Sequence, residues 1–233
     1  MKTIFENDQL TKSSRVGYAA LVMLWSLLPG PAIWCGLHFF KSAAVSYALY
    51  HGIALIGIVL GYSLWKDGIR KPSIKQALFL VAATIVFSIA AVFLYRHFGP
   101  YLFSKTRAIY VMSEQGWCRE LFWPISLYAI IINPIVEELF WRGVVLNALD
   151  KLAAPLKWLG IVWSSSAFGL LHYSIARMVV RPEIAFMFIF CLAAFGAILS
   201  TIYRKTQSLT LITLIHSLLP DLAAVVLMLQ IMP

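Results

Sequence analysis

Charged residues are scarce in this 233-residue chain. Asp, Glu, Lys and Arg together make up 12% of it, whereas hydrophobic residues make up 61%. Soluble domains usually contain about 25% charged residues. A soluble protein with the present balance could not cover its surface with polar side chains. The composition therefore excludes an ordinary soluble domain and indicates a polytopic membrane protein.

Cysteine is also scarce, and its positions exclude two further classes of protein. Cys35, Cys118 and Cys191 share no regular spacing, so they form neither a metal-binding pair nor an evident disulfide framework. We interpret them as small apolar residues. The chain has no internal repeat and no low-complexity tract. Its polar first 15 residues are not followed by a short apolar core and cleavage site, so we expect no removable signal peptide.

Long apolar runs, in contrast, are abundant. A helix needs about 20 apolar residues to cross a bilayer, and seven segments meet this requirement. They are residues 16–39, 43–65, 77–95, 121–149, 156–177, 184–203 and 209–232. The sequence Pro29-Gly-Pro31 could divide the first of them, which would make eight. We therefore predict an all-α transmembrane helical bundle of seven or eight spans, forming one integral membrane domain over residues 1–233.

The basic residues predict the orientation of the chain. With the N-terminus in the cytoplasm, 11 Lys and Arg residues fall in inner segments and 7 in outer segments. Inner loops usually carry the excess of positive charge, so we expect a cytoplasmic N-terminus and a location in the cell membrane. The net charge of +9 is spread over many loops. It forms no patch for nucleic acid, and we expect no such partner.

The fourth run, 121–149, contains three charged residues that need an explanation. One charge at the centre of a membrane helix costs roughly 2.5–3.5 kcal/mol, and such residues are usually functional. Glu138 and Arg142 lie four residues apart on one helical face and can form an ion pair. Glu137 is turned about 100° away and shares its face with Asn133. Glu137 is therefore free to act as a general base. The alternative is one internal ion-pair network that only fixes helix packing.

Two histidines in later runs complete the predicted site. Glu137 lies 18 residues before Pro155 in the expected turn, and His172 lies 17 residues after it. Equal distances from the turn of a helical hairpin mean equal depth. His216 lies in the seventh run, which enters from the same side. Pro220 removes the helical hydrogen bond to the carbonyl of His216, and Asp221 adds another ionisable group.

Two other polar residues receive a structural interpretation. His51 has no acidic companion in the second run, so we expect it to be packed rather than catalytic. Ser165 lies seven residues before His172 and could suggest a serine nucleophile. Small hydroxyl residues in membrane helices are, however, more often close-packing positions.

The pattern Glu137-Glu138-x-x-x-Arg142, then Phe168-x-x-x-His172, then His216 resembles the CPBP family of intramembrane proteases. This family includes the CAAX prenyl proteases and the bacteriocin-processing, or Abi, proteins. The resemblance covers residues 121–221. It implies that Glu137 activates a water with help from His172, that His216 stabilises the oxyanion, and that Glu138 and Arg142 hold the site together.

The last motif of the family departs from its usual form in this chain. The family usually has Asn or Asp four residues after the second histidine, where this chain has Pro220. Asp221 follows and could replace the missing group if Pro220 bends the helix. Glu137 and the two histidines could also bind zinc. The helical H-E-x-x-H pattern is absent, so we favour metal-free hydrolysis and predict no cofactor.

The sequence therefore predicts an intramembrane endopeptidase acting on a peptide of a membrane-associated or lipidated protein. Its catalytic residues are Glu137, His172 and His216. Glu138, Arg142, Asp221 and Asn133 support them. Two alternatives stay open: a transporter or ion relay, and a catalytically silent scaffold of the same family. A relay would need polar residues along a path through the membrane, whereas here they cluster at one depth.

Overall fold

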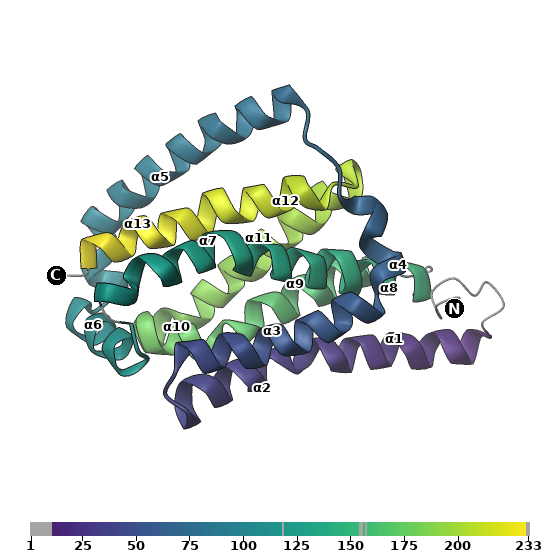
Figure 1. Ribbon diagram of the computed structural model, residues 1–233, viewed down its shortest axis with the longest axis horizontal. Helices are drawn as coiled ribbons and strands as arrows, with labels where there is room; N and C mark the ends of the chain where they lie inside the picture. Colours follow the sequence, from purple (N-terminus) through teal and green to yellow (C-terminus); the bar gives the residue numbers. More distant parts are fainter. Residues whose placement is uncertain (1–10, 118, 154–155, 157, 232–233) are drawn as a thin grey trace.

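The computed structural model describes residues 11–117, 119–153, 156 and 158–231 of the chain (Figure 1). Their regular structure is helical, apart from the isolated β-bridge between Phe103 and Val180. The predicted all-α fold is therefore confirmed. Cys118, Pro155, the polar segment before Thr11 and the end of the last predicted run lie outside the described residues.

The helices follow one another with short connections. They are α1 (Lys12–Leu27), α2 (Pro29–Trp34), α3 (Ala43–Leu60), α4 (Tyr62–Trp65), α5 (Ile74–Leu102), α6 (Lys105–Glu114), α7 (Phe122–Glu138), α8 (Asn147–Leu152), α9 (Leu159–Leu171), α10 (Tyr173–Val179), α11 (Ala185–Thr206), α12 (Leu209–His216) and α13 (Leu222–Ile231). Three π-helical segments continue α2, α7 and α12 without a loop. They are η2 (Cys35–Phe39), η5 (Leu139–Leu146) and η7 (Ser217–Asp221).

Six helical stretches of the described residues are long and apolar enough to cross a membrane. They are Ser13–Phe39, Ala43–Leu60, Ile74–Leu102, Leu159–Val179, Pro182–Thr206 and Leu209–Gln230. The protein is thus a multi-pass membrane protein. Pro29 does not divide the first stretch, because it occupies the first turn of α2, where its missing N–H has no helical partner to lose.

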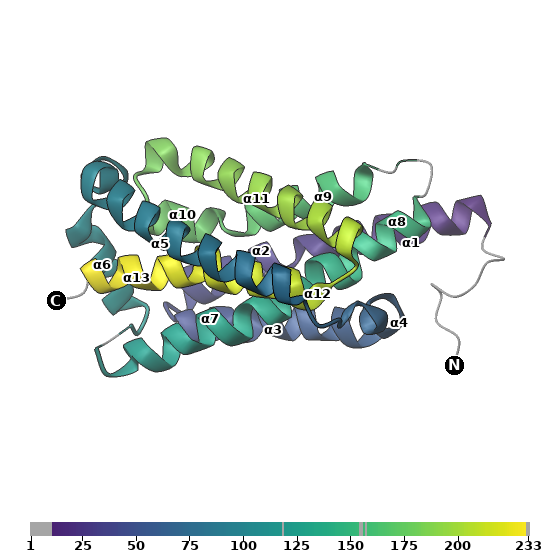
Figure 2. The ribbon, with the colours of Figure 1, turned by 90° about the horizontal axis from the view of Figure 1, so that it is seen from above.

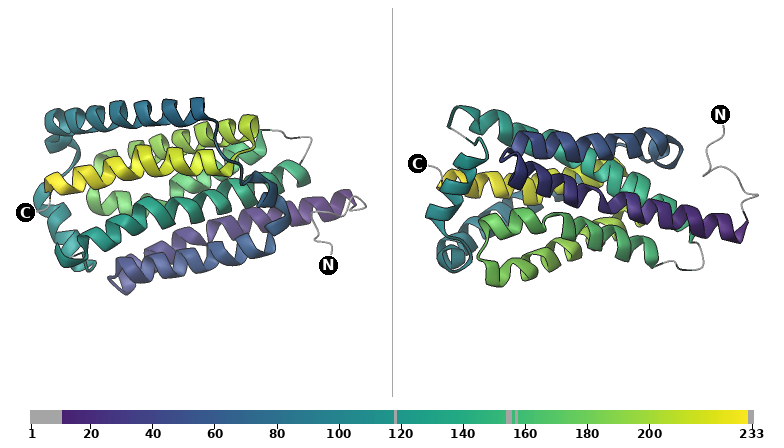
Figure 3. Two further views of the ribbon diagram at one scale, coloured as in Figure 1. Left: turned by 45° about the horizontal axis from the view of Figure 1, so that its top comes forward. Right: turned by 90° about the horizontal axis from the view of Figure 1, so that it is seen from below.

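The remaining predicted run, 121–149, is not among these six stretches. It is nevertheless helical from Phe122 to Leu152, through α7, η5 and α8. Its η5 part is buried inside the bundle and packs against α9, whereas α7 packs one face against α3, α12 and η7 and exposes the other (Figures 2 and 3). A seventh span therefore stays a prediction, and the charges of this segment face other helices.

The helix ends lie at the two ends of the bundle as expected for spans that alternate in direction. The start of α1, the α4 segment and α8 lie at one end of the bundle, whereas α6 and the end of α13 lie at the other (Figure 1). The basic connection between α4 and α5 is therefore at the same end as the start of α1. Which end faces the cytoplasm stays a prediction from charge.

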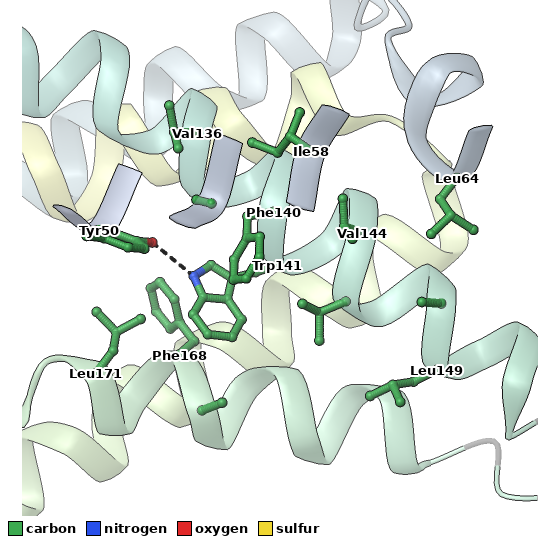
Figure 4. Close-up of a cluster of buried hydrophobic side chains, with 14 of the residues drawn as sticks. Tyr50, Ile58, Leu64, Val136, Phe140, Trp141, Val144, Leu149, Phe168 and Leu171 are labelled. Carbon is green, nitrogen blue, oxygen red and sulfur yellow. Dashed lines mark hydrogen bonds between the residues drawn. The ribbon is translucent and has the colours of Figure 1, made fainter. Parts of the chain in front are cut away.

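The hydrophobic core surrounds the junction of α7 and η5. Phe140, Trp141 and Phe168 are almost fully buried there (Figure 4). Trp141 donates its indole N–H to the Tyr50 hydroxyl of α3, with the two atoms 3.2 Å apart. This hydrogen bond satisfies a polar group that has no access to water. The core therefore fixes α3, η5 and α9 around the residues that precede Trp141, including the two glutamates.

Candidate active site

The predicted ion pair between Glu138 and Arg142 is confirmed. The Arg142 Nη1 and Glu138 Oε1 atoms are 2.8 Å apart, and both side chains are fully buried. Arg142 also donates to the Gly196 carbonyl at 3.0 Å and to the Ser200 Oγ at 3.4 Å, both on α11. Its guanidinium lies 4.9 Å from the centre of the Phe168 ring. Arg142 therefore ties the glutamate pair to α9 and α11.

His216 lies among three carboxyl groups. Its Nδ1 is 2.7 Å from Glu138 Oε1, whereas its Nε2 is 3.5 Å from Glu137 Oε2 and 3.7 Å from Asp221 Oδ1. Both nitrogens thus face oxygen atoms that accept hydrogen bonds, which suits a ring with two N–H donors. The two distances at Nε2 are longer than a good hydrogen bond.

Asp221 reaches His216 because the chain between them is π-helical. In a regular α-helix, residues five apart point about 140° away from each other. Ser217–Asp221 instead forms a π-helical turn that contains Pro220. A π-helix pairs residues five apart, so Asp221 comes to the same face as His216. Asp221 therefore lies near His216, as the sequence left open, through a π-helical turn that contains Pro220 rather than through a sharp bend.

His172 lies directly after α9, and a backbone hydrogen bond fixes its tautomer. Its Nδ1 is 2.8 Å from the Phe168 carbonyl oxygen. A carbonyl oxygen can only accept, so Nδ1 carries the hydrogen and the Nε2 of the neutral ring is an acceptor. His172 and Glu137 line the same cavity. The ring is therefore placed to accept a hydrogen bond from a water molecule near Glu137.

Three carboxyl oxygens of the site lack a hydrogen-bond partner. Glu137 Oε2, Glu138 Oε2 and Asp221 Oδ2 are buried and accept no hydrogen bond from the described residues. Buried polar atoms are nearly always paired, so an orphan needs an explanation. For Glu137 and Asp221, which line the cavity, a water molecule or a substrate group there would supply the missing donor. The Glu137 oxygen without a hydrogen bond, Oε2, is the atom that faces His216.

The cavity that contains these groups has a volume of about 400 Å³ and is mainly apolar. Its polar lining includes Glu137, His172 and Asp221, and also Asn133, Tyr47 and Tyr50. Its apolar lining comes from α2, α3, α6, α10 and α13. Helices α2, α3 and α6, which lie outside the runs that contain the predicted catalytic residues, thus form part of its wall.

Three aromatic residues of α3 were missed as neighbours of the site. Tyr47 and Tyr50 line the cavity, and Tyr50 lies close enough to Glu137 to interact with it. His51 is buried, as expected, but it is hydrogen-bonded to Tyr128 and to Asn133 of α7. No local pattern indicates these contacts, since their partners lie 77 and 82 residues further along the chain.

The geometry does not suit a bound metal ion. Both histidines hold their Nδ1 against a protein oxygen, as metal-bound histidines often do. Within the part of the chain that the structure describes, however, no group of three or more His, Cys, Asp or Glu side chains has an arrangement that could hold a metal ion, although His216 lies near three carboxyl groups. The residues therefore do not fit the zinc site that Glu137, His172 and His216 could have formed.

The remaining candidates have structural roles. Ser165 is buried where α9 approaches Gly196 of α11, and it does not line the cavity. Its position suits the close-packing role expected from the sequence. Cys35 and Cys191 are free thiols, so neither belongs to a disulfide.

The comparisons with known proteins point to the same half of the chain. Residues 119–219 match the family described as type II CAAX prenyl endopeptidase Rce1-like. No curated protein and no solved structure matches the chain. The match includes both glutamates, Arg142 and both histidines, and it ends two residues before Asp221. Within this multi-pass membrane protein, residues 119–219 form a domain of the Rce1-like type II CAAX prenyl endopeptidase family, which belongs with the CPBP and Abi proteins.

Proposed function

We propose that the protein is an intramembrane endopeptidase in which Glu137 activates the hydrolytic water. The observation that carries the proposal is the buried Glu137 Oε2. It accepts no hydrogen bond from the described residues and lies 3.5 Å from His216 Nε2. A base must reach the proton that it removes, directly or through one water. Glu137 lines the cavity, so a water molecule there can reach its carboxyl group.

The proposed first step is the addition of water to the scissile peptide carbonyl. Glu137 Oε2 takes one proton from the water, and the water oxygen forms a bond to the carbonyl carbon. The Nε2 of His172 accepts a hydrogen bond from the other water proton and so orients the molecule. The N–H at His216 Nε2 donates to the former carbonyl oxygen and stabilises its negative charge. Preorganised hydrogen-bond donors commonly stabilise oxyanions in this way.

The proposed second step breaks the carbon–nitrogen bond. The protonated Glu137 returns its proton to the leaving nitrogen, so the products are a carboxylic acid and an amine. Glu137 thus acts first as a base and then as an acid, and no outside reagent except water is used. Glu138 and Arg142 take no proton. They hold His216 through its Nδ1 and keep its Nε2 directed at Glu137 and Asp221, which line the cavity.

The proposed substrate is a peptide of a membrane-associated or lipidated protein. The apolar lining includes Ile33, Leu37, Val179 and Met228, which would bind apolar side chains or a lipid group. Residues of α6 and the end of α13 also line the cavity, so it extends from Glu137 toward the end of the bundle opposite the N-terminus (Figure 1). We propose that the peptide reaches Glu137 from that end.

The proposal can be tested with purified protein reconstituted in liposomes. Lipidated and unlipidated membrane-anchored peptides would be incubated with it in water enriched in ¹⁸O, and the products identified by mass spectrometry. Direct attack by water places one ¹⁸O atom in the new carboxylate after a single turnover. The absence of any cleaved peptide, or transport of ions without cleavage, would contradict the proposal.

We expect activity to survive the removal of metal ions. The reason is that the described His, Asp, Glu and Cys side chains do not converge on a metal-binding point. Activity would be measured after dialysis against a strong chelator, with a known zinc protease in the same buffer as the control. Elemental analysis showing one zinc per chain, with activity lost on its removal and restored by its return, would overturn this prediction.

Asp221 can stabilise the oxyanion only as a neutral carboxylic acid that donates its O–H. In that role, Asp221→Ala is expected to reduce kcat by about 10²–10³-fold, the usual effect of losing one oxyanion donor. Pro220→Ala should also reduce it, because it allows the regular helix that would turn Asp221 away from His216. Adding Pro220→Asn to Asp221→Ala should restore part of the activity. Cleavage at the normal rate by Asp221→Ala would show that Asp221 is only a packing partner.

A further inference from the structure

Three polar side chains form a hydrogen-bonded chain that ends beside Glu137. The Tyr128 hydroxyl is 2.5 Å from Nδ1 of His51, and Nε2 of His51 is 3.1 Å from Oδ1 of Asn133. Asn133 precedes Glu137 by one helical turn, on the same face of α7, and lies within interaction distance of its carboxyl group. His51 comes from α3, outside the family domain of residues 119–219.

The hydrogen-bond acceptors among these three side chains determine which way each group points. The Oδ1 of Asn133 can only accept, so His51 donates from Nε2. A neutral ring then accepts at Nδ1, and the Tyr128 hydroxyl donates to it. The Nδ2 group of Asn133 is consequently turned away from His51 and toward Glu137. The reverse orientation would place an amide oxygen against a carboxylate oxygen, which is unfavourable.

The packing around His51 leaves the ring little freedom. Its centre lies 5.0 Å from that of the Tyr50 ring, 5.5 Å from Tyr47 and 5.6 Å from Tyr128. The exposed fraction of His51 is 5% and that of Asn133 is 9%. Neither side chain can therefore exchange its protein partner for bulk water. The α3 helix thus imposes one orientation on an amide that would otherwise be free to rotate.

We propose that His51, held by Tyr128, is a positioning residue that directs the Asn133 amide N–H to Glu137. This hydrogen bond occupies one side of the carboxyl group and keeps Oε2 directed at His216 and the cavity. The inference rests on the proposed role of Glu137 as the base. It adds that a helix outside the family domain sets the orientation of this base.

The test compares single variants with their combination. The His51→Ala and Asn133→Ala variants should each lower kcat by about 10-fold or more, with KM within twofold of the unchanged protein. The kcat of the double variant should be no lower than that of the less active single variant, because both changes remove the same effect. His51→Gln should recover part of the rate, since its amide can still donate to Oδ1. His97→Ala is the control, because His97 is an exposed histidine of α5.

A second readout separates this inference from the proposed function. The carboxylate band of Glu137 would be identified by infrared difference spectroscopy of the unchanged protein against Glu137→Gln. His51→Ala and Asn133→Ala should shift that band by the same amount, whether or not a substrate is found. Losses in kcat that multiply in the double variant, or a band that Asn133→Ala shifts and His51→Ala does not, would overturn the inference. An unchanged protein that cleaves nothing would instead contradict the proposed function.

Discussion

Replacing Glu137 by Gln is expected to lower kcat by about 10²–10⁴-fold, the usual contribution of a general acid or base. The amide has nearly the same shape as the carboxyl group but cannot take a proton from water. The Glu137 Oε2 atom accepts no hydrogen bond from the described residues and makes only the long 3.5 Å contact with His216 Nε2, so the substitution removes little structural interaction. We therefore expect normal insertion, normal purified yield and an unchanged melting profile. The measurement is single-turnover cleavage of a reconstituted membrane-anchored peptide.

A surface glutamate provides the matched control for this prediction. Glu114 of α6 lies 3.9 Å from Lys41 in an exposed ion pair, and exposed pairs contribute little to stability. Glu114→Gln should therefore cleave at the normal rate. Full cleavage by the Glu137→Gln protein would remove Glu137 from the mechanism. Equal losses in both variants would indicate a general effect of charge on the protein or its substrate.

Local patterns were sufficient to predict the centre of the site. The spacing of Glu138 and Arg142 gave their ion pair, because residues four apart on a helix are neighbours in any tertiary context. The missing N–H of Pro220 predicted a disturbed helix beside His216, and the structure has a π-helical turn there. These features depend on the nearest few residues, so a single sequence contains them.

Contacts between distant segments could not be predicted in the same way. His51 has no acidic neighbour in the sequence, and its partner Asn133 is 82 residues away. The contribution of α2, α3 and α6 to the cavity depends on how helices pack, which an apolar run does not specify. In a membrane the residues that face lipid and those that face other helices are both apolar, so hydrophobicity alone does not separate them.

The buried ion pair gives the second large effect, and it concerns folding. Glu138→Gln leaves Arg142 without its carboxylate at a fully buried position. It also replaces the charged partner of His216 Nδ1. Removing one member of a buried pair typically costs about 3–5 kcal/mol, because the other charge stays desolvated. We therefore expect Glu138→Gln to have a low folded yield and a lowered melting temperature, measured on the detergent-solubilised protein. In the same measurement, Glu137→Gln should match the unchanged protein.

The origin of that loss can be tested by removing the second charge as well. Replacing a whole buried pair by apolar residues of similar volume is often neutral for stability. Combining Glu138→Leu with Arg142→Met should therefore recover folded yield relative to either single change. It should not recover cleavage, since His216 then lacks the carboxylate that holds its Nδ1. If Glu138→Gln instead melts like the unchanged protein, the Gly196 carbonyl and the Ser200 hydroxyl are sufficient partners for Arg142. Glu138 would then matter for the orientation of His216 and not for the fold.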